Sequence, residues 1–190
     1  MPSVLPSGSL KGQFVIAMPA LADPNFFQTV TCISEHSDQG ALGIIINRVH
    51  ALLSAKDIFS ELDLEMRIDA SKIPVYIGGP VHGDEVFVLH GPPMDFDGCL
   101  PVTDTLALSN SLDVLAAMAK GQGPETALIA LGCAGWAPGQ LDAEMRQNAW
   151  LTGPATSDII FRVSVHERWQ QAIRSIGIDP ALLTDVAGHA

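Results

Sequence analysis

Residues 131–150 read LGCAGWAPGQLDAEMRQNAW and join an apolar segment to an amphipathic one through a turn rich in glycine. The run TALIALG (126–132) is typical of a short strand, and residues 139–149 have the apolar spacing of an α-helix. The glycines and Pro138 between them predict a tight passage from strand to helix. Enzymes hold reactive side chains at such passages, so Cys133 is the first candidate for chemistry.

Two interpretations of Cys133 compete. A nucleophile elbow has the order Gly-x-Cys-x-Gly, whereas this chain has Gly-Cys-Ala-Gly and Pro138 delays the helix. The helix dipole acts mainly within its terminal turn, so it should lower the pKa of this thiol little. We therefore favour a small buried apolar side chain over a catalytic thiol.

The rest of the chain mixes strands and helices without strict alternation. The patterns predict strands at 13–18, 28–35, 41–47, 73–77, 85–90, 126–132 and 158–163, and helices near 54–62, 111–120, 139–149 and 165–176. Two pairs of adjacent strands, 28–35 with 41–47 and 73–77 with 85–90, look like hairpins, while residues 91–101 form a loop. Ser54 and Asp57 have the spacing of a capping box. These elements predict one α/β domain over residues 1–190, with a mixed sheet and helices packed outside.

The composition restricts the classes of partner. Charged residues are 16% of the chain, below the usual level of about 25%, so we expect an apolar patch used either for self-association or for contact with a partner. The net charge is −11 and the 10 basic residues are scattered, which makes direct nucleic-acid binding unexpected. The three cysteines have no CxxC spacing, so the sequence indicates neither a disulfide framework nor a zinc site.

One apolar run imitates a targeting signal. FVIAMPALA (14–22) ends like a signal-peptide cleavage site, but Pro19 interrupts it and only Lys11 precedes it as a basic residue. No run approaches the roughly 20 apolar residues that a membrane helix needs. We therefore expect a cytoplasmic protein that does not contact the membrane.

Two further motifs suggest a metal site and a phosphate site, but the spacing of their residues does not match the known patterns. His82 and His90, with Asp84 and Glu85 nearby, are the best metal candidates, but their spacing matches no standard site. The loop that begins Gly78-Gly79-Pro80 lacks the Lys-Ser/Thr pair of a phosphate loop, and proline has no amide hydrogen to donate. We therefore predict no metal and no cofactor, and a tight turn at these glycines.

The helix after Pro138 carries a polar stripe. Gln140, Glu144 and Asn148 repeat at helical spacing beside an apolar packing stripe. The simpler interpretation is a solvated face. The sharper one is that Gln140 and Asn148 hydrogen-bond the glycine loop and shape a concave site lined by Trp136 and Trp150.

Several motifs together resemble the YqgE/AlgH family of bacterial proteins, over nearly the whole chain. They are FVIAMPALADPNF (14–26), EH (35–36), GIIINR (43–48), VYIGGPV (75–81), FVLHG (87–91), LGCAGWAPGQLDAEMRQNAWL (131–151), RW (168–169) and GHA (188–190). The resemblance implies a compact domain whose bent mixed sheet forms a pseudo-barrel wrapped by helices, and a cytosolic location. Members are often labelled transcriptional regulators, but the resemblance brings no settled activity and no catalytic residues.

Two positions depart from the family pattern. The family usually has Tyr where this chain has Cys133, and Glu where it has Asp142. Because a tyrosine cannot replace a nucleophilic thiol, the departure argues further against catalysis by Cys133.

Two hypotheses on function follow. The leading one is a non-enzymatic regulatory or adaptor protein that acts through protein contacts and influences transcription without gripping DNA. The alternative is an enzyme or small-ligand-binding protein with a site between the loops 78–83 and 132–139, where Arg48 would hold a carboxylate. The candidate binding residues are Asn47, Arg48, Gly78, Gly79, His82, Trp136, Gln140 and Asn148.

Overall fold

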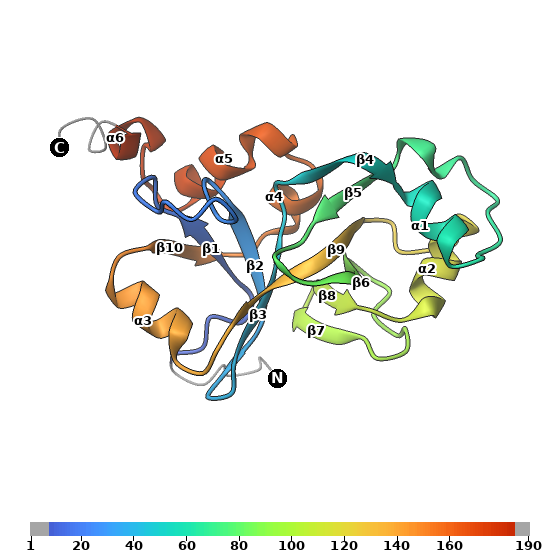
Figure 1. Ribbon diagram of the computed structural model, residues 1–190, viewed down its shortest axis with the longest axis horizontal. Coiled ribbons are helices and arrows are strands. Elements are labelled where there is room, and N and C mark those ends of the chain that lie inside the picture. Colours follow the sequence, from blue (N-terminus) through green and yellow to red (C-terminus); the bar gives the residue numbers. More distant parts are fainter. Residues whose placement is uncertain (1–7, 185–190) are drawn as a thin grey trace.

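The computed structural model describes residues 8–184 and shows a bent β-sheet with helices arranged around it (Figure 1). The strands are β1 (Gln13–Ala17), β2 (Val30–Ser37), β3 (Gly40–Ile45), β4 (Val49–Ser54), β5 (Pro74–Ile77), β6 (Val81–His90), β7 (Leu100–Thr103), β8 (Leu106–Ser109), β9 (Ala127–Trp136) and β10 (Trp150–Pro154). The α-helices are α1 (Ala55–Glu61), α2 (Leu112–Ala119), α3 (Gln140–Arg146), α4 (Ser157–Phe161), α5 (Arg168–Ser175) and α6 (Pro180–Thr184). Single 3-10 turns lie at η1 (Ala70–Lys72) and η2 (Val165–Glu167). The α/β class is confirmed.

The main path of the sheet is β10-β1-β2-β3-β9-β6-β8-β7. Neighbours along this path are antiparallel, and β5 adds a parallel pair with β9, so the expected mixed sheet is confirmed. Within residues 8–184, β10 pairs only with β1 and β7 only with β8. The sheet is therefore bent but open, and the expected pseudo-barrel describes it only loosely.

Strand β9 joins the two halves of the sheet, and in Figure 1 it runs through the centre of the molecule. Along one edge it pairs with β6. Along the other edge its first half pairs with β5, up to Ile77 opposite Leu131, and its last three residues pair with β3. Gly132 lies between these two sections with φ +70°, a conformation that favours glycine. The strand thus changes partner at Gly132.

The expected hairpin between 73–77 and 85–90 is wrong, because β5 and β6 lie on opposite edges of β9. The chain leaves β5 opposite Leu131 and enters β6 opposite Cys133, so the intervening residues cross directly over β9. A sequence pattern shows two strands and a turn, but it does not show that a distant strand inserts between them. The pairing of β5 and β6 with the distant strand β9 therefore replaces the hairpin that the local pattern predicts.

Three glycines make this crossing possible. A Cβ on Gly78 would collide with the carbonyl oxygen of Gly132, and one on Gly79 would collide with the backbone of Cys133. From the other side, a Cβ on Gly132 would lie 2.7 Å from the carbonyl oxygen of Gly79. The amide of Gly78 donates to the carbonyl of Leu131 at 2.8 Å, so the two segments are hydrogen-bonded as well as packed.

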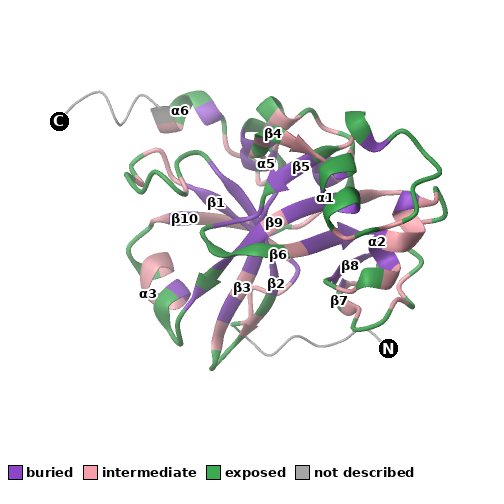
Figure 2. Ribbon diagram, turned by 45° about the vertical axis from the view of Figure 1, so that its right-hand side comes forward, coloured by how far each residue is buried: buried purple, intermediate pink, exposed green. Residues whose placement is uncertain are grey.

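Buried side chains form three groups around these strands. Figure 2 colours the buried residues of the ribbon purple. Helix α5 covers one group through Trp169 and Ile173, and α1 and α2 cover a second through Phe59 and Leu115. Helix α3 covers the third through Leu141. These helices therefore each bury apolar side chains against the sheet.

Local signals predicted several elements correctly. The hairpin of β2 and β3 is present, and Ser37 pairs with Gly40 at its turn. Helix α1 begins after Ser54 with the predicted capping box, in which Ser54 N donates to the Asp57 carboxylate at 2.8 Å. These hydrogen bonds hold the pKa of Asp57 below its usual value.

The expected strand at 158–163 is wrong, because this segment forms α4. Thr156 caps the helix by accepting from Ile159 N, and Ile159 and Ile160 bury against the sheet. A short apolar run fits a buried helix as well as a strand, and the cap decides between them. The sequence patterns also missed four short strands, β4, β7, β8 and β10. The motif GHA at 188–190, and the ends of the expected domain 1–190, lie outside the described residues.

The crossing predicts a large effect for one added methyl group. Gly78→Ala should destabilise the fold by about 3 kcal/mol or more, the upper range for overpacking, because its Cβ meets backbone rather than a flexible side chain. Chemical denaturation would measure the change. The matched control is Gly83→Ala, since a Cβ on Gly83 meets nothing within 4 Å. Equal stability of the two variants would contradict the proposed role of the crossing.

Candidate functional site

The predicted site residues fall in separate places. Asn47 and Arg48 follow β3 and line a pocket beside α5. Gly78 and Gly79 are buried in the crossing over β9, whereas His82 is exposed on β6. The remaining three, Trp136, Gln140 and Asn148, surround α3.

The loops 78–83 and 132–139 do meet, but they meet as packed backbone. Gly78 and Gly79 contact the backbone of Gly132 and Cys133 so closely that no Cβ fits. This contact leaves no space for a ligand between the two glycine segments.

Glu144 organises the residues around α3. Its Oε2 accepts from Trp136 Nε1 at 3.0 Å and from Trp150 Nε1 at 2.8 Å, and its Oε1 accepts from Gln140 Nε2 at 3.0 Å. Gln140 Oε1 in turn accepts from the Ala137 amide at 2.9 Å, so Gln140 does hold the end of the glycine loop. Both indoles are buried, with 6% and 4% of Trp136 and Trp150 exposed. This network satisfies buried donors and stabilises a corner of the fold.

Asn148 has another role. It lies just after α3 with φ +56°, in the left-handed region that asparagine tolerates. It ends the helix, and its side chain makes no hydrogen bond to the glycine loop within residues 8–184. Trp136 also borders a smaller pocket of about 350 Å³ that it shares with His36.

Cys133 is a buried side chain of β9, with none of its surface exposed. Burial raises the pKa of its thiol to about 11, and the charge of Glu85 adds to this effect. Burial likewise raises the pKa of Cys32 to about 12. The interpretation of Cys133 as a small apolar side chain is confirmed by its position.

The two histidines of the metal candidate do not come together. His90 is buried, where Nε2 lies 2.9 Å from Ser109 Oγ and Nδ1 lies 2.7 Å from the Gly91 carbonyl. Burial lowers the pKa of His90, and the contact with Gly91 opposes this. His82 instead lies on the surface, 3.3 Å from Glu85. Nowhere in residues 8–184 do three or more potential metal ligands gather.

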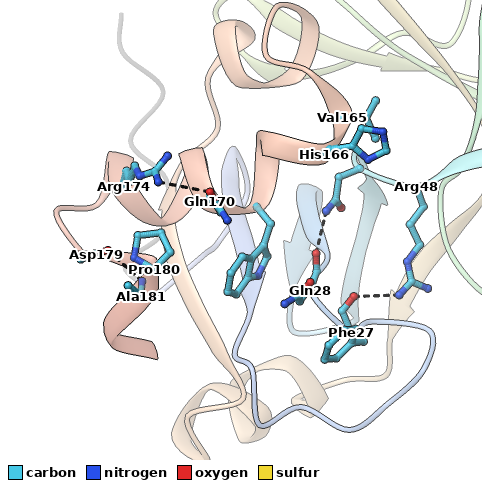
Figure 3. A pocket seen from close by; sticks show the side chains of 12 residues that line it. Phe27, Gln28, Arg48, Val165, His166, Gln170, Arg174, Asp179, Pro180 and Ala181 are labelled. Atoms are coloured by element: carbon cyan, nitrogen blue, oxygen red, sulfur yellow. Dashed lines mark hydrogen bonds between the residues drawn. The ribbon is translucent and has the colours of Figure 1, made fainter. Parts of the chain in front are cut away.

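A pocket of about 560 Å³ lies between α5, α6 and the loops that follow β1 and β3 (Figure 3). Its size falls within the range of small-molecule sites. The lining residues are Phe27, Gln28, Asn47, Arg48, Val165, His166, Trp169, Gln170, Arg174, Asp179, Pro180 and Ala181.

The loop side of this pocket is held by Asn47 and Arg48. Asn47 Nδ2 donates to the Gln28 carbonyl at 2.8 Å. Arg48 donates from Nη1 to the Pro24 carbonyl at 2.9 Å and from Nη2 to the Phe27 carbonyl at 3.0 Å, as Figure 3 shows for Phe27. Both side chains thus position the loop after β1, and Arg48 brings a positive charge to the pocket wall.

The helix side is built by α5. Trp169 and Ile173 face the sheet, and Trp169 Nε1 donates to the Ala17 carbonyl at 3.0 Å. The opposite face of the helix therefore exposes Gln170 and Arg174, which are one turn apart and linked by a hydrogen bond of 3.4 Å. Figure 3 shows both side chains at the edge of the pocket.

The charges around the pocket differ from those of the whole chain. Arg48, Arg174 and the exposed His166 line it, and Asp179 is its one carboxylate among the lining residues. The Asp179 carboxylate already accepts from the Ala181 amide at 3.0 Å. In a chain of net charge −11, this is a local excess of positive groups. The pocket is suited to an anion.

The described lining residues include no Ser, Thr, Cys or Lys. They do include His166 and Asp179, whose side chains can take part in acid–base or covalent chemistry.

Sequence reasoning found Asn47 and Arg48 but missed the helix that completes this pocket. His166, Gln170 and Arg174 lie more than a hundred residues away in sequence. The spacing of Gln170 and Arg174 does predict a shared exposed face. No local pattern shows that this face lies beside Arg48.

The pKa shifts predict which cysteine reacts in the folded protein. At pH 8 the Cys133 thiol stays protonated, because burial raises its pKa to about 11, and the side chain is out of reach of the reagent, so iodoacetamide should label the partly exposed Cys99 instead. Peptide mass spectrometry would locate the label. In urea all three cysteines should react alike. Preferential labelling of Cys133 in the native protein would contradict this assignment.

No helix in the described part of the chain is long and apolar enough to cross a membrane.

Comparison with known proteins identifies relatives over the full length of the fold. The AlgH-like family model matches residues 14–181. The UPF0301 protein of Desulforapulum autotrophicum is 49% identical over 184 residues, which are 97% of this chain and 97% of that protein. The UPF0301 protein of Thioalkalivibrio sulfidiphilus is 47% identical over 184 residues, covering 97% and 98%.

Solved structures agree with this result. The solution structure of the AlgH protein from Pseudomonas aeruginosa has a TM-score of 0.81 and 45% sequence identity, and the match covers 100% of both chains. Protein DIP2367 of Corynebacterium diphtheriae has a TM-score of 0.72 at 21% identity, covering 90% and 88%, and shows a likeness of fold alone. The chain therefore belongs to the AlgH-like family.

Proposed function

We propose that this protein is a non-enzymatic binding protein that holds a small organic anion in the pocket between α5, α6 and the loops after β1 and β3. The observation that carries the proposal is the gathering of Arg48, Arg174 and His166 around one pocket in an acidic chain. Such a protein would have a regulatory role in the cytoplasm. Binding of the ligand would alter its contacts with another protein.

The lining indicates what the organic part of the ligand looks like. Phe27 is 51% exposed at the pocket, so its ring is available for stacking. Figure 3 shows the side chain of Gln170 at the edge of the pocket. Trp169 also lines the pocket. A planar ring that bears a phosphate or carboxylate matches these groups.

Arg174 provides the cleanest test, because it is exposed and bonded only to Gln170 among the described residues. Arg174→Gln should weaken binding of phenyl phosphate about threefold to tenfold, since it removes one charge-assisted contact. The indole N–H resonance of Trp169 would report binding during an NMR titration.

The matched control is Arg146→Gln, which removes an exposed arginine from α3, a helix that does not line the pocket. Phenol, which lacks the anionic group, should bind more weakly than phenyl phosphate. Equal binding of both compounds, or an equal loss in both variants, would refute an anion site here.

A second candidate function is an adaptor that works through protein contacts. Strand β4 pairs with β5 and with no other strand in residues 8–184, so one of its edges is unpaired. Leu52 on β4 is 87% exposed, and Val49 and Ile77 are also exposed nearby. An exposed apolar strand edge favours contact with a partner.

The adaptor hypothesis makes its own prediction. Leu52→Asp should abolish capture of a protein partner from the source bacterium, while the melting temperature stays nearly unchanged because Leu52 packs against little. Native pull-down with mass spectrometry would measure capture. Leu112→Asp is the control, since Leu112 is an exposed leucine on a different element, α2. Identical partners for the wild type and both variants would exclude β4 as the contact.

A further inference from the structure

Arg168, the first residue of α5, is a buried cation without an acidic partner. Only 4% of its surface is exposed. Its Nε donates to the Val163 carbonyl at 3.0 Å, and its Nη1 donates to the Ile46 carbonyl. Its guanidinium carbon lies 5.3 Å from the centre of the Tyr76 ring. Within residues 8–184 no carboxylate lies within 4.0 Å of this guanidinium.

This arrangement leaves the positive charge only partly offset. Two carbonyl dipoles and the face of an aromatic ring stabilise an arginine less than a carboxylate does, and removing a cation from water is costly. The Nη2 group of Arg168 makes no hydrogen bond within the described residues. Donors therefore remain for a bound anion.

A second pocket, of about 270 Å³, opens onto Arg168 and Tyr76. It lies where β5 and β9 begin, beside α4. Polar and apolar atoms contribute about equally to its surface, and seven of its ten lining residues have apolar or aromatic side chains. Those seven are Ile73, Pro74, Tyr76, Ala127, Leu128, Ile160 and Phe161, and the polar ones are Glu125, Thr126 and Arg168. A buried charge beside several apolar side chains is an arrangement that suits an amphipathic ligand.

The negative charge of Glu125 in the lining favours an anion with one charge over an anion with two. Glu125 is exposed at this pocket and carries a negative charge, so it disfavours a ligand with two charges, such as phosphate. A carboxylate carries one charge and matches the planar donors of arginine. The apolar lining suits an aliphatic or aromatic group on the same molecule.

We propose that this pocket binds a small apolar carboxylic acid, whose carboxylate accepts hydrogen bonds from Arg168. The site is separate from the anion pocket of the proposed function. Trp169, the next residue in the chain, lines that other pocket, so the adjacent Arg168 and Trp169 border two different pockets. Failure of one site leaves the other untouched.

The test is an NMR titration with 4-methylpentanoate and its neutral analogue 4-methylpentanamide. The backbone amides of Tyr76, Thr126 and Ala127 should shift with the acid, and the amide should bind at least about tenfold more weakly because it lacks the charge. An acetylated dipeptide ending in leucine, with a free or an amidated C-terminus, distinguishes a peptide end from a free acid. Tighter binding of the free dipeptide than of 4-methylpentanoate would assign the carboxylate to a peptide.

Three variants define the roles of the charges. Arg168→Gln should weaken binding of the acid at least about tenfold, and Glu125→Gln should strengthen it about twofold to fivefold by removing repulsion. Arg162→Gln is the matched control, because Arg162 is an exposed arginine at the end of α4 that does not line the pocket. Glu125→Gln keeps the test valid even where Arg168→Gln unfolds the chain, since Glu125 is exposed.

Several results would overturn the proposal. These are equal binding of the acid and the amide, weaker binding of the acid to Glu125→Gln, shifts confined to residues of the other pocket, or no saturable shift at about 20 mM acid. Loss of phenyl phosphate binding in Arg174→Gln would not affect this result, because that variant alters only the pocket beside α6.

Discussion

The fold depends on the direct contact of two backbone segments at Gly78, Gly79 and Gly132. There the chain crosses over β9 on its way from β5 to β6, and side chains are excluded from both surfaces. The crossing places β5 and β6 on opposite edges of one strand. It also lets β9 exchange β5 for β3 as a neighbour at Gly132, which connects the two halves of the sheet. Close packing of backbone against backbone therefore holds these strands together at the crossing, where no side chains lie between them.

Helix α5 packs on this sheet and borders two pockets. Its apolar face is fixed on the sheet by Trp169 and Ile173, and this leaves Gln170 and Arg174 on the open side. Arg168, at the start of the same helix, is buried and lines a different pocket, beside α4. One short helix thus borders two pockets of different chemistry. In an acidic chain, both pockets are lined by arginine.

Sequence reasoning succeeded where the determinants are local. The capping box of Ser54 and Asp57 and the hairpin of β2 and β3 depend on residues within a few positions of each other. It failed at 158–163, where an apolar run fits both a strand and a helix and the Thr156 cap selects the helix. It failed again for β5 and β6, because a hairpin pattern cannot reveal an inserted strand. The pocket beside α5 was half found, through Asn47 and Arg48, since its other wall lies far along the chain.

The sequence by itself determined the class of fold, the family resemblance, the acidic balance and the interpretation of Cys133 as a small apolar side chain. Each of these rests on composition or on residues that are near neighbours in the chain. Only the tertiary structure decided that Gly78 and Gly79 pack on β9 instead of enclosing a ligand, that Glu144 joins Trp136 to Trp150, and that two pockets flank α5. The physical reason is that these contacts join segments distant in sequence, and their geometry follows from the pairing order of the strands.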